Sequence, residues 1–298
     1  MAGPSDGAAR RPLPAPLGRY AAGVAITVVA ILSQYFVPQN VPALQVVYYS
    51  LPGDLFVVYG IPILAFAVLV GAGPLRNWPA NVDTATWQGL RWFGGLGLLA
   101  LFIIFVLTIV YELIDPSALA LLSKPNPALT QAQGNPWFWV GFSFVIGALE
   151  ETIFRGWIFG YWRDRSGGWI VPALWTSVVF AGVHVYYGLT YEAAYPLIFP
   201  SLFLTGVAFA ATYRASGGNL VIVALIHGAS DATAFLTIIS LGLGVALHYL
   251  IIGVGAIILL IQYFGKQELP PNLVYPQPWP APPRSPGPPA PPAGAVQG

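Results

Sequence analysis

The stretch that decides the fold runs from Trp137 to Gly160 and reads WFWVGFSFVIGALEETIFRGWIFG. It is apolar and long enough for a membrane-spanning helix, which needs about 20 residues. Two adjacent carboxylates, Glu150 and Glu151, and one guanidinium, Arg155, nevertheless lie inside it. A single charge near the bilayer centre costs roughly 2.5 to 3.5 kcal/mol on insertion scales. Three charges in one span therefore require partners or a function.

The composition of the whole chain indicates an integral membrane protein. Of its 298 residues, 56% are hydrophobic and only 8% are charged, whereas a soluble domain carries about 25% charged residues. The net charge of +1, without any basic run, excludes electrostatic binding of nucleic acid. Because the chain has no cysteine, thiol nucleophiles, disulfides and thiolate metal sites are excluded as well.

Eight apolar stretches predict an all-α, polytopic membrane protein with a polar site in the core of its helical bundle. When the segment before the first stretch is placed in the cytoplasm, nearly all lysines and arginines fall on the inner side. We therefore expect a protein of a bacterial-type plasma membrane with both termini cytoplasmic. The predicted spans lie at about 20–36, 54–72, 88–111, 137–160, 169–187, 196–213, 219–239 and 242–264.

Composition also divides the chain into three regions. Residues 1–18 are small, polar and proline-rich, which predicts a disordered cytoplasmic head. Residues 19–265 form the predicted transmembrane domain. Its first apolar run lacks a small-x-small cleavage site, so we interpret it as an uncleaved span rather than a signal peptide. Residues 266–298 are dominated by proline and predict a disordered tail.

The spacing of the buried ionisable residues indicates that some form a structural ion pair and others are available for chemistry. Glu151 and Arg155 are i and i+4, about 40° apart on a helix, which suits a structural ion pair. Glu150 is rotated by about 100° from Glu151 and can face a cavity. The residues in question are Glu150, Glu151, Arg155, His184, His227, Asp231 and His248.

The histidines extend this set to other spans. His227 and Asp231 are also i and i+4, and His184 follows Phe180 by the same spacing. A single membrane histidine more often makes a helix-helix hydrogen bond than a catalytic site. At about 1.5 Å per residue, however, Glu150, His184 and His227 lie roughly 12 to 23 Å from the presumed inner ends of their helices. We expect these three to converge, and we interpret His248 as structural because it lacks a partner at such spacing.

The spaced residues resemble three motifs of the CPBP family, which comprises intramembrane CAAX proteases and bacteriocin-processing, or Abi, proteins. The resemblance covers about residues 137–235. It implies an intramembrane endopeptidase that hydrolyses a peptide bond near the cytoplasmic leaflet. Residues 150–155, Glu-Glu-Thr-Ile-Phe-Arg, resemble the EExxxR motif, residues 180–184 resemble FxxxH, and residues 227–231 resemble the HxxxN type.

The resemblance also implies roles. Glu150 would activate a water together with His184, and His227 with position 231 would stabilise the tetrahedral oxyanion. Glu151 and Arg155 would hold the geometry. The family most often has asparagine where Asp231 stands in this sequence. An ionised Asp231 would repel an oxyanion, so it is protonated, paired with His227 or used for another purpose.

A zinc mechanism is the alternative chemistry for the same residues. The family has been described as metalloproteases, and Glu150, His184 and His227 are possible Zn²⁺ ligands that leave a position for water. There is no HExxH pair, and the resemblance equally implies a glutamate mechanism, so we favour catalysis without a metal or other cofactor. The expected partners are the lipid bilayer and a membrane-associated peptide or protein, prenylated or not.

Three alternatives fit the sequence less well than proteolysis by a glutamate mechanism. A non-catalytic membrane scaffold or immunity protein of the same family would not need the complete set of Glu150, His184 and His227. A proton-coupled transporter would more naturally show broken helices in two repeats. A serine nucleophile at Ser230 is disfavoured because the GxSxG elbow needs a closing glycine, and Ala232 stands there.

Overall fold

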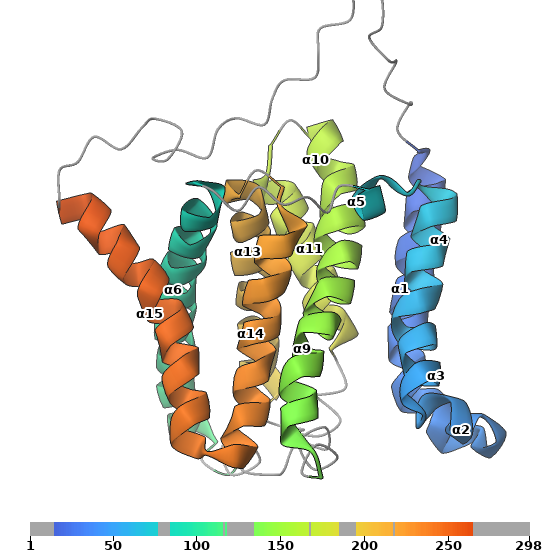
Figure 1. Cartoon of the computed structure of the whole chain (residues 1–298), viewed down its shortest axis with the longest axis horizontal. Coiled ribbons are helices and arrows are strands. Elements are labelled where there is room, and N and C mark those ends of the chain that lie inside the picture. The colour runs from blue at the N-terminus through green and yellow to red at the C-terminus, as the bar shows by residue number, and fades with distance from the viewer. Residues whose placement is uncertain are drawn as a thin grey trace, which may run out of the picture.

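The computed structural model describes residues 15–76, 84–115, 117, 134–166, 168–184, 195–216 and 218–264. Within these ranges the chain forms helices and no strand, which confirms the predicted all-α class. Long helices stand roughly side by side, with α15 leaning away from the others at one end (Figure 1). They are α1 (Leu17–Asn40), α6 (Thr84–Ile114), α9 (Pro136–Glu151), α11 (Ile170–Val183), α13 (Tyr195–Ala215), α14 (Leu220–Ile239) and α15 (Leu241–Phe264).

Four of the described helical segments are long and apolar enough to cross a membrane: Leu17–Asn40, Leu51–Leu69, Pro136–Trp162 and Ile198–Ala215. They coincide with four of the predicted spans and agree with an integral membrane protein. Helices also occupy the other predicted ranges, but three of these contain only shorter apolar segments, Ile170–Val183, Leu220–Leu236 and Gly242–Val254. The predicted number of eight spans is therefore not confirmed by the described part of the chain.

The second candidate span is built from several short helices. After α1 the chain forms the 3-10 turn η1 (Pro42–Leu44), α2 (Gln45–Tyr48), α3 (Leu51–Leu55), the π-helical turn η2 (Phe56–Gly60) and α4 (Ile61–Leu69), followed by α5 (Gly73–Arg76). Pro62 lies in the first turn of α4 and has no backbone N–H, so the regular hydrogen-bond ladder cannot continue through it. A wider turn in η2 accommodates this interruption. We call residues 17–69 the N-terminal hairpin.

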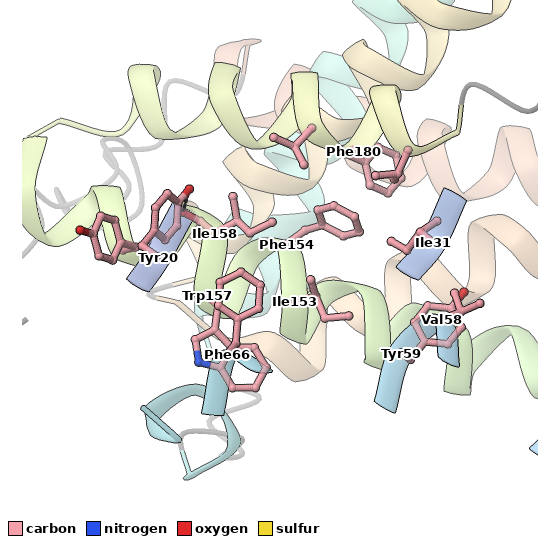
Figure 2. Packing of buried hydrophobic residues seen from close by; sticks show 13 residues of the cluster. Tyr20, Ile31, Val58, Tyr59, Phe66, Ile153, Phe154, Trp157, Ile158 and Phe180 are labelled. Carbon is pink, nitrogen blue, oxygen red and sulfur yellow. Dashed lines mark hydrogen bonds between the residues drawn. The ribbon is translucent and has the colours of Figure 1, made fainter. Parts of the chain in front are cut away.

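Aromatic side chains attach the N-terminal hairpin to the rest of the molecule (Figure 2). The Tyr20 hydroxyl accepts hydrogen bonds from the indole nitrogens of Trp162 (3.0 Å) and Trp175 (2.8 Å). Further along the hairpin, the Phe66 ring stacks on Trp157 with the ring centroids 5.5 Å apart. The rings of Tyr20, Phe66 and Trp157 are almost completely buried. The hairpin and the segment after α9 therefore share one apolar core.

Two glycines bring α9 and α14 into backbone contact. A Cβ atom on Gly147 of α9 would lie 2.7 Å from the amide nitrogen of Gly228 on α14. A Cβ atom on Gly228 would lie 2.6 Å from the Cα of Phe144. Small residues at such crossings let membrane helices approach closely. Since Gly228 directly follows His227, this crossing determines how near His227 comes to α9.

Several predicted features fall outside the described structure. Residues 1–14 of the predicted head and residues 265–298, which include the predicted tail, are not among the described residues. His248 lies in α15, but its side chain is also outside the described part.

Candidate active site

The charged cluster lies where α9 passes into a π-helical segment. The helix begins with the Asn135 side chain accepting a hydrogen bond from the backbone N–H of Phe138, and Pro136 occupies its first turn. Glu150 and Glu151 are its last residues. The chain then continues without a break through η4 (Thr152–Phe159) into α10 (Gly160–Ser166). A π-helical turn is wider than an α-helical one and is often found at functional sites. Arg155 lies inside this wider segment.

Arg155 and Glu151 form the ion pair that their spacing predicts. The guanidinium Nη1 donates to Glu151 Oε1 at 2.8 Å, and both side chains are completely buried. Its Nη2 donates to the backbone carbonyl of Gly206 on α13, also at 2.8 Å. The rings of Phe180 and Phe209 lie 5.1 and 5.2 Å from the guanidinium carbon, within range of cation-π attraction. Arg155 therefore links η4 to α11 and α13.

His227 is the second partner of Glu151, which the sequence did not indicate. Its Nδ1 lies 2.7 Å from Glu151 Oε1, the same oxygen that accepts from Arg155. Because a carboxylate oxygen accepts, Nδ1 is the donor, and the imidazole orientation is fixed. The ring also stacks on Phe209, with centroids 4.5 Å apart. The predicted clamp thus holds a histidine of α14 in addition to Arg155.

Glu150 points to different partners from those of Glu151. Its Oε1 accepts a hydrogen bond from the hydroxyl of Tyr59 in η2 at 3.1 Å. Its Oε2 is buried, has no hydrogen-bond partner among the described residues and lies 3.7 Å from His227 Nε2. A buried carboxylate oxygen without a donor is unusual and requires an explanation.

Asp231 lies on the other side of the same imidazole nitrogen. Its Oδ2 is 3.5 Å from His227 Nε2, and its side chain is 39% exposed, against 11% for that of Glu150. Nε2 of His227 therefore lies between a buried carboxylate and a more open one. The i, i+4 spacing of His227 and Asp231 places them on one face of α14, as the sequence predicts.

His184 approaches the cluster through an aromatic ring. It follows the last residue of α11, and its Nδ1 is 2.6 Å from the carbonyl oxygen of Phe180. Its ring centroid is 4.6 Å from that of Phe180, which in turn is 5.9 Å from the ring of His227. Because a carbonyl oxygen can only accept, Nδ1 is the donor in this hydrogen bond.

Besides the contact of His227 with Glu151, the sequence did not indicate three further groups of the site: the Tyr59 hydroxyl, the Gly206 carbonyl and the Phe209 ring. Each comes from a helix other than the one that carries its partner. Spacing within one helix gives no information about such contacts. The one available signal was a tyrosine within the apolar run 54–72, and this signal is weak because tyrosines are common in membrane helices.

The donor set does not support a metalloprotease. Among the described residues, no group of three or more His, Asp or Glu side chains has the arrangement of a metal site. Zinc ligation through Glu150, His184 and His227 has no support from this arrangement.

Comparison with known proteins finds a family model that matches one segment of the chain. Residues 132–233 match the family model described as type II CAAX prenyl endopeptidase Rce1-like. The matched segment is about a third of the chain and contains all six site residues expected from the motifs, whereas the N-terminal hairpin and α15 lie outside it. The match confirms the resemblance to CAAX proteases. No curated protein and no solved structure gives a significant match.

Proposed function

We propose that Glu150 activates a water for peptide hydrolysis within the membrane, because residues 132–233 match the family model of the Rce1-like type II CAAX prenyl endopeptidases, a family of membrane proteases. The substrate is a membrane-associated or lipidated peptide. The observation that carries the proposal is the buried Glu150 Oε2, which lacks a hydrogen-bond donor among the described residues and lies 3.7 Å from His227 Nε2.

The proposed reaction begins with Glu150 as the general base. Glu150 takes a proton from a water, and the oxygen of that water bonds to the carbonyl carbon of the scissile peptide. His184 helps to orient the water. The carbonyl oxygen becomes an oxyanion. When the C–N bond breaks, Glu150 returns the proton to the leaving nitrogen, so protons and charge balance at the end of the cycle.

His227 is the proposed donor to the oxyanion. Its Nδ1–H is held by Glu151, which fixes the direction of Nε2. In the doubly protonated ring, Nε2–H is the donor that the oxyanion accepts. The site contains three carboxyl groups, those of Glu150, Glu151 and Asp231. Its two positive charges come from Arg155 and a doubly protonated His227. Asp231 pairs with Nε2 in the resting site and, being more exposed, can turn toward water when the oxyanion forms.

The proposal includes the arrangement in the membrane. All eight apolar segments cross or enter the bilayer of a bacterial-type plasma membrane, with both termini in the cytoplasm. Four described helical segments have the length and hydropathy of spans. The excess of lysine and arginine in the segments assigned to the inner side supports the orientation.

The test measures peptide cleavage by the purified chain in lipid nanodiscs. The probe is an internally quenched peptide ending in a farnesylated CAAX sequence, compared with the same peptide without the farnesyl group. Glu150→Gln is expected to lower kcat by about 10² or more, the usual contribution of a general base. Glu112→Gln, which changes an exposed glutamate of α6, is the matched control and should keep the wild-type rate.

Retention of the wild-type rate by a folded Glu150→Gln variant would remove Glu150 from the mechanism. Equal cleavage of the two peptides would keep the protease but exclude selection for the prenyl group.

A further inference from the structure

One residue of the site comes from outside the segment that matches the protease family. Tyr59 lies in η2 of the N-terminal hairpin, and its hydroxyl donates to Glu150 Oε1 at 3.1 Å. The family match begins only at residue 132. Both residues are 8% exposed, so water does not easily replace this hydrogen bond. The hairpin therefore contributes a polar atom to a buried carboxylate of another part of the chain.

The surroundings give this hydrogen bond a particular weight. Among the described residues, Tyr59 donates a hydrogen bond to Glu150 Oε1, whereas Glu150 Oε2 has no hydrogen-bond partner. Hydrogen bonds to charged groups are stronger than neutral ones. With Oε1 occupied by Tyr59, the carboxyl plane is fixed and Oε2 is the oxygen directed toward His227.

A purely structural explanation of the Tyr59–Glu150 hydrogen bond is that any buried tyrosine hydroxyl needs an acceptor. Tyr48 of the same hairpin satisfies that need locally, since its hydroxyl bonds to Ser33 Oγ at 2.9 Å. Tyr59 instead meets an acceptor 91 positions away in the sequence. The hairpin can therefore supply a hydrogen-bond acceptor for a tyrosine hydroxyl from its own residues, without a contact to the site.

The backbone around both partners is specialised. Tyr59 lies in the π-helical turn η2, and Glu150 lies directly before the π-helical segment η4. Val58 and Tyr59 are buried in the same apolar cluster as Ile153 and Phe154 of η4 (Figure 2). Phe56, in contrast, is exposed. The wider turn thus directs Tyr59 to η4, and π-helical turns occur frequently at functional sites.

We propose that Tyr59 is a positioning residue for the general base: it holds Glu150 Oε1 so that Oε2 faces the reacting water. The inference rests on the proposed function of Glu150. It extends the catalytic unit to the N-terminal hairpin, beyond the segment shared with the family. A protein reduced to residues 132–233 would therefore lack part of its own site.

The first test separates catalysis from binding in the nanodisc assay with the farnesylated peptide. Tyr59→Phe is expected to lower kcat about tenfold to hundredfold, the range for losing a hydrogen bond to a charged group, while KM changes by less than about twofold. Tyr48→Phe, which removes a tyrosine hydrogen bond from the same hairpin, should leave both constants unchanged. A folded Tyr59→Phe variant with wild-type kcat overturns the inference.

The second test does not depend on cleavage. Infrared difference spectra identify the Glu150 carboxyl band as the one that Glu150→Gln removes. Tyr59→Phe should shift this band and Tyr48→Phe should not, and an unshifted band in Tyr59→Phe overturns the inference. Should Tyr59→Phe fold poorly, 3,5-difluorotyrosine at position 59 keeps the side-chain shape and should shift the same band. A wild-type chain that fails to cleave the peptide would overturn the proposed function, while the band still decides whether Tyr59 holds Glu150.

Discussion

At the scale of single residues, the site is centred on Glu151 Oε1. This one oxygen accepts hydrogen bonds from two donors, a guanidinium and an imidazole. Arg155 Nη1 and His227 Nδ1 lie 2.8 and 2.7 Å from it, on η4 and α14 respectively. Glu151 Oε2 and Arg155 Nε are buried without hydrogen-bond partners among the described residues. The cluster is therefore only partly satisfied, and its stability depends on the charges that remain paired.

Removing one member of this clamp is expected to destabilise the protein. Glu151→Gln leaves the Arg155 guanidinium buried without its counter-charge and weakens the hold on His227, a change that costs about 3 to 5 kcal/mol. The measurement is the yield of folded protein and its thermal unfolding in detergent. Glu112→Gln at an exposed position is the control. An unfolding midpoint equal to that of the wild type would refute the clamp.

Position 231 provides a second residue-scale prediction. Asparagine, the residue that the family most often has there, can accept from His227 Nε2–H and can donate its own N–H to an oxyanion. Asp231→Asn should therefore keep kcat within about threefold of the wild type at neutral pH, whereas Asp231→Leu should lower it by about 10² through the loss of both functions. Equal losses in the two variants would show that the carboxylate charge itself is needed.

At the scale of the elements, the crossing of α9 and α14 determines the distance between His227 and the two glutamates. Gly228→Ala would place a Cβ 2.6 Å from the Cα of Phe144, and backbone cannot move aside as a side-chain end can. The helices should separate, with a stability loss of about 1 to 3 kcal/mol and a large loss of cleavage. Thermal unfolding and the peptide assay measure the two effects.

Gly141→Ala is the matched control, because a Cβ at this position of α9 meets nothing within 4 Å. It should leave both unfolding and cleavage unchanged, or slightly raise stability through better helix propensity. If Gly228→Ala behaved like Gly141→Ala, the close crossing would not control the site.

The same comparison of elements shows what the sequence can and cannot predict. The i, i+4 spacing correctly places Glu151 beside Arg155 and His227 beside Asp231, since each pair lies on a single helix. Hydropathy likewise gives helices at all predicted ranges. The contacts of Tyr59, Gly206 and Phe209 with the site depend on how separate helices pack, and no periodicity within one helix encodes that packing.

The number of spans is not confirmed for a related reason. Hydropathy windows detect apolar runs, whereas the length of a helix depends on where local geometry ends it. The helix Ile170–Val183 ends directly before His184, although the apolar run predicted as a span extends from 169 to 187.

At the scale of the whole molecule, the orientation in the membrane is open to a direct test. The chain contains no cysteine, so each single substitution introduces one thiol. A membrane-impermeant maleimide should label Ser123→Cys in intact cells, and Ser5→Cys and Ser285→Cys only after permeabilisation. Labelling of either terminal position in intact cells would contradict the cytoplasmic placement of that terminus.

The hydrogen bonds at Tyr20 impose an order on biosynthesis. Trp162 and Trp175, which donate to its hydroxyl, follow it by 142 and 155 residues. At roughly 5 to 20 residues per second of synthesis, Trp175 follows Tyr20 by about 8 to 31 s. The contacts of the hairpin with Trp162 and Trp175 consequently form late, and Tyr59 can reach Glu150 only after α9 has been made. An unfinished chain in the membrane thus holds the glutamate but not the complete site.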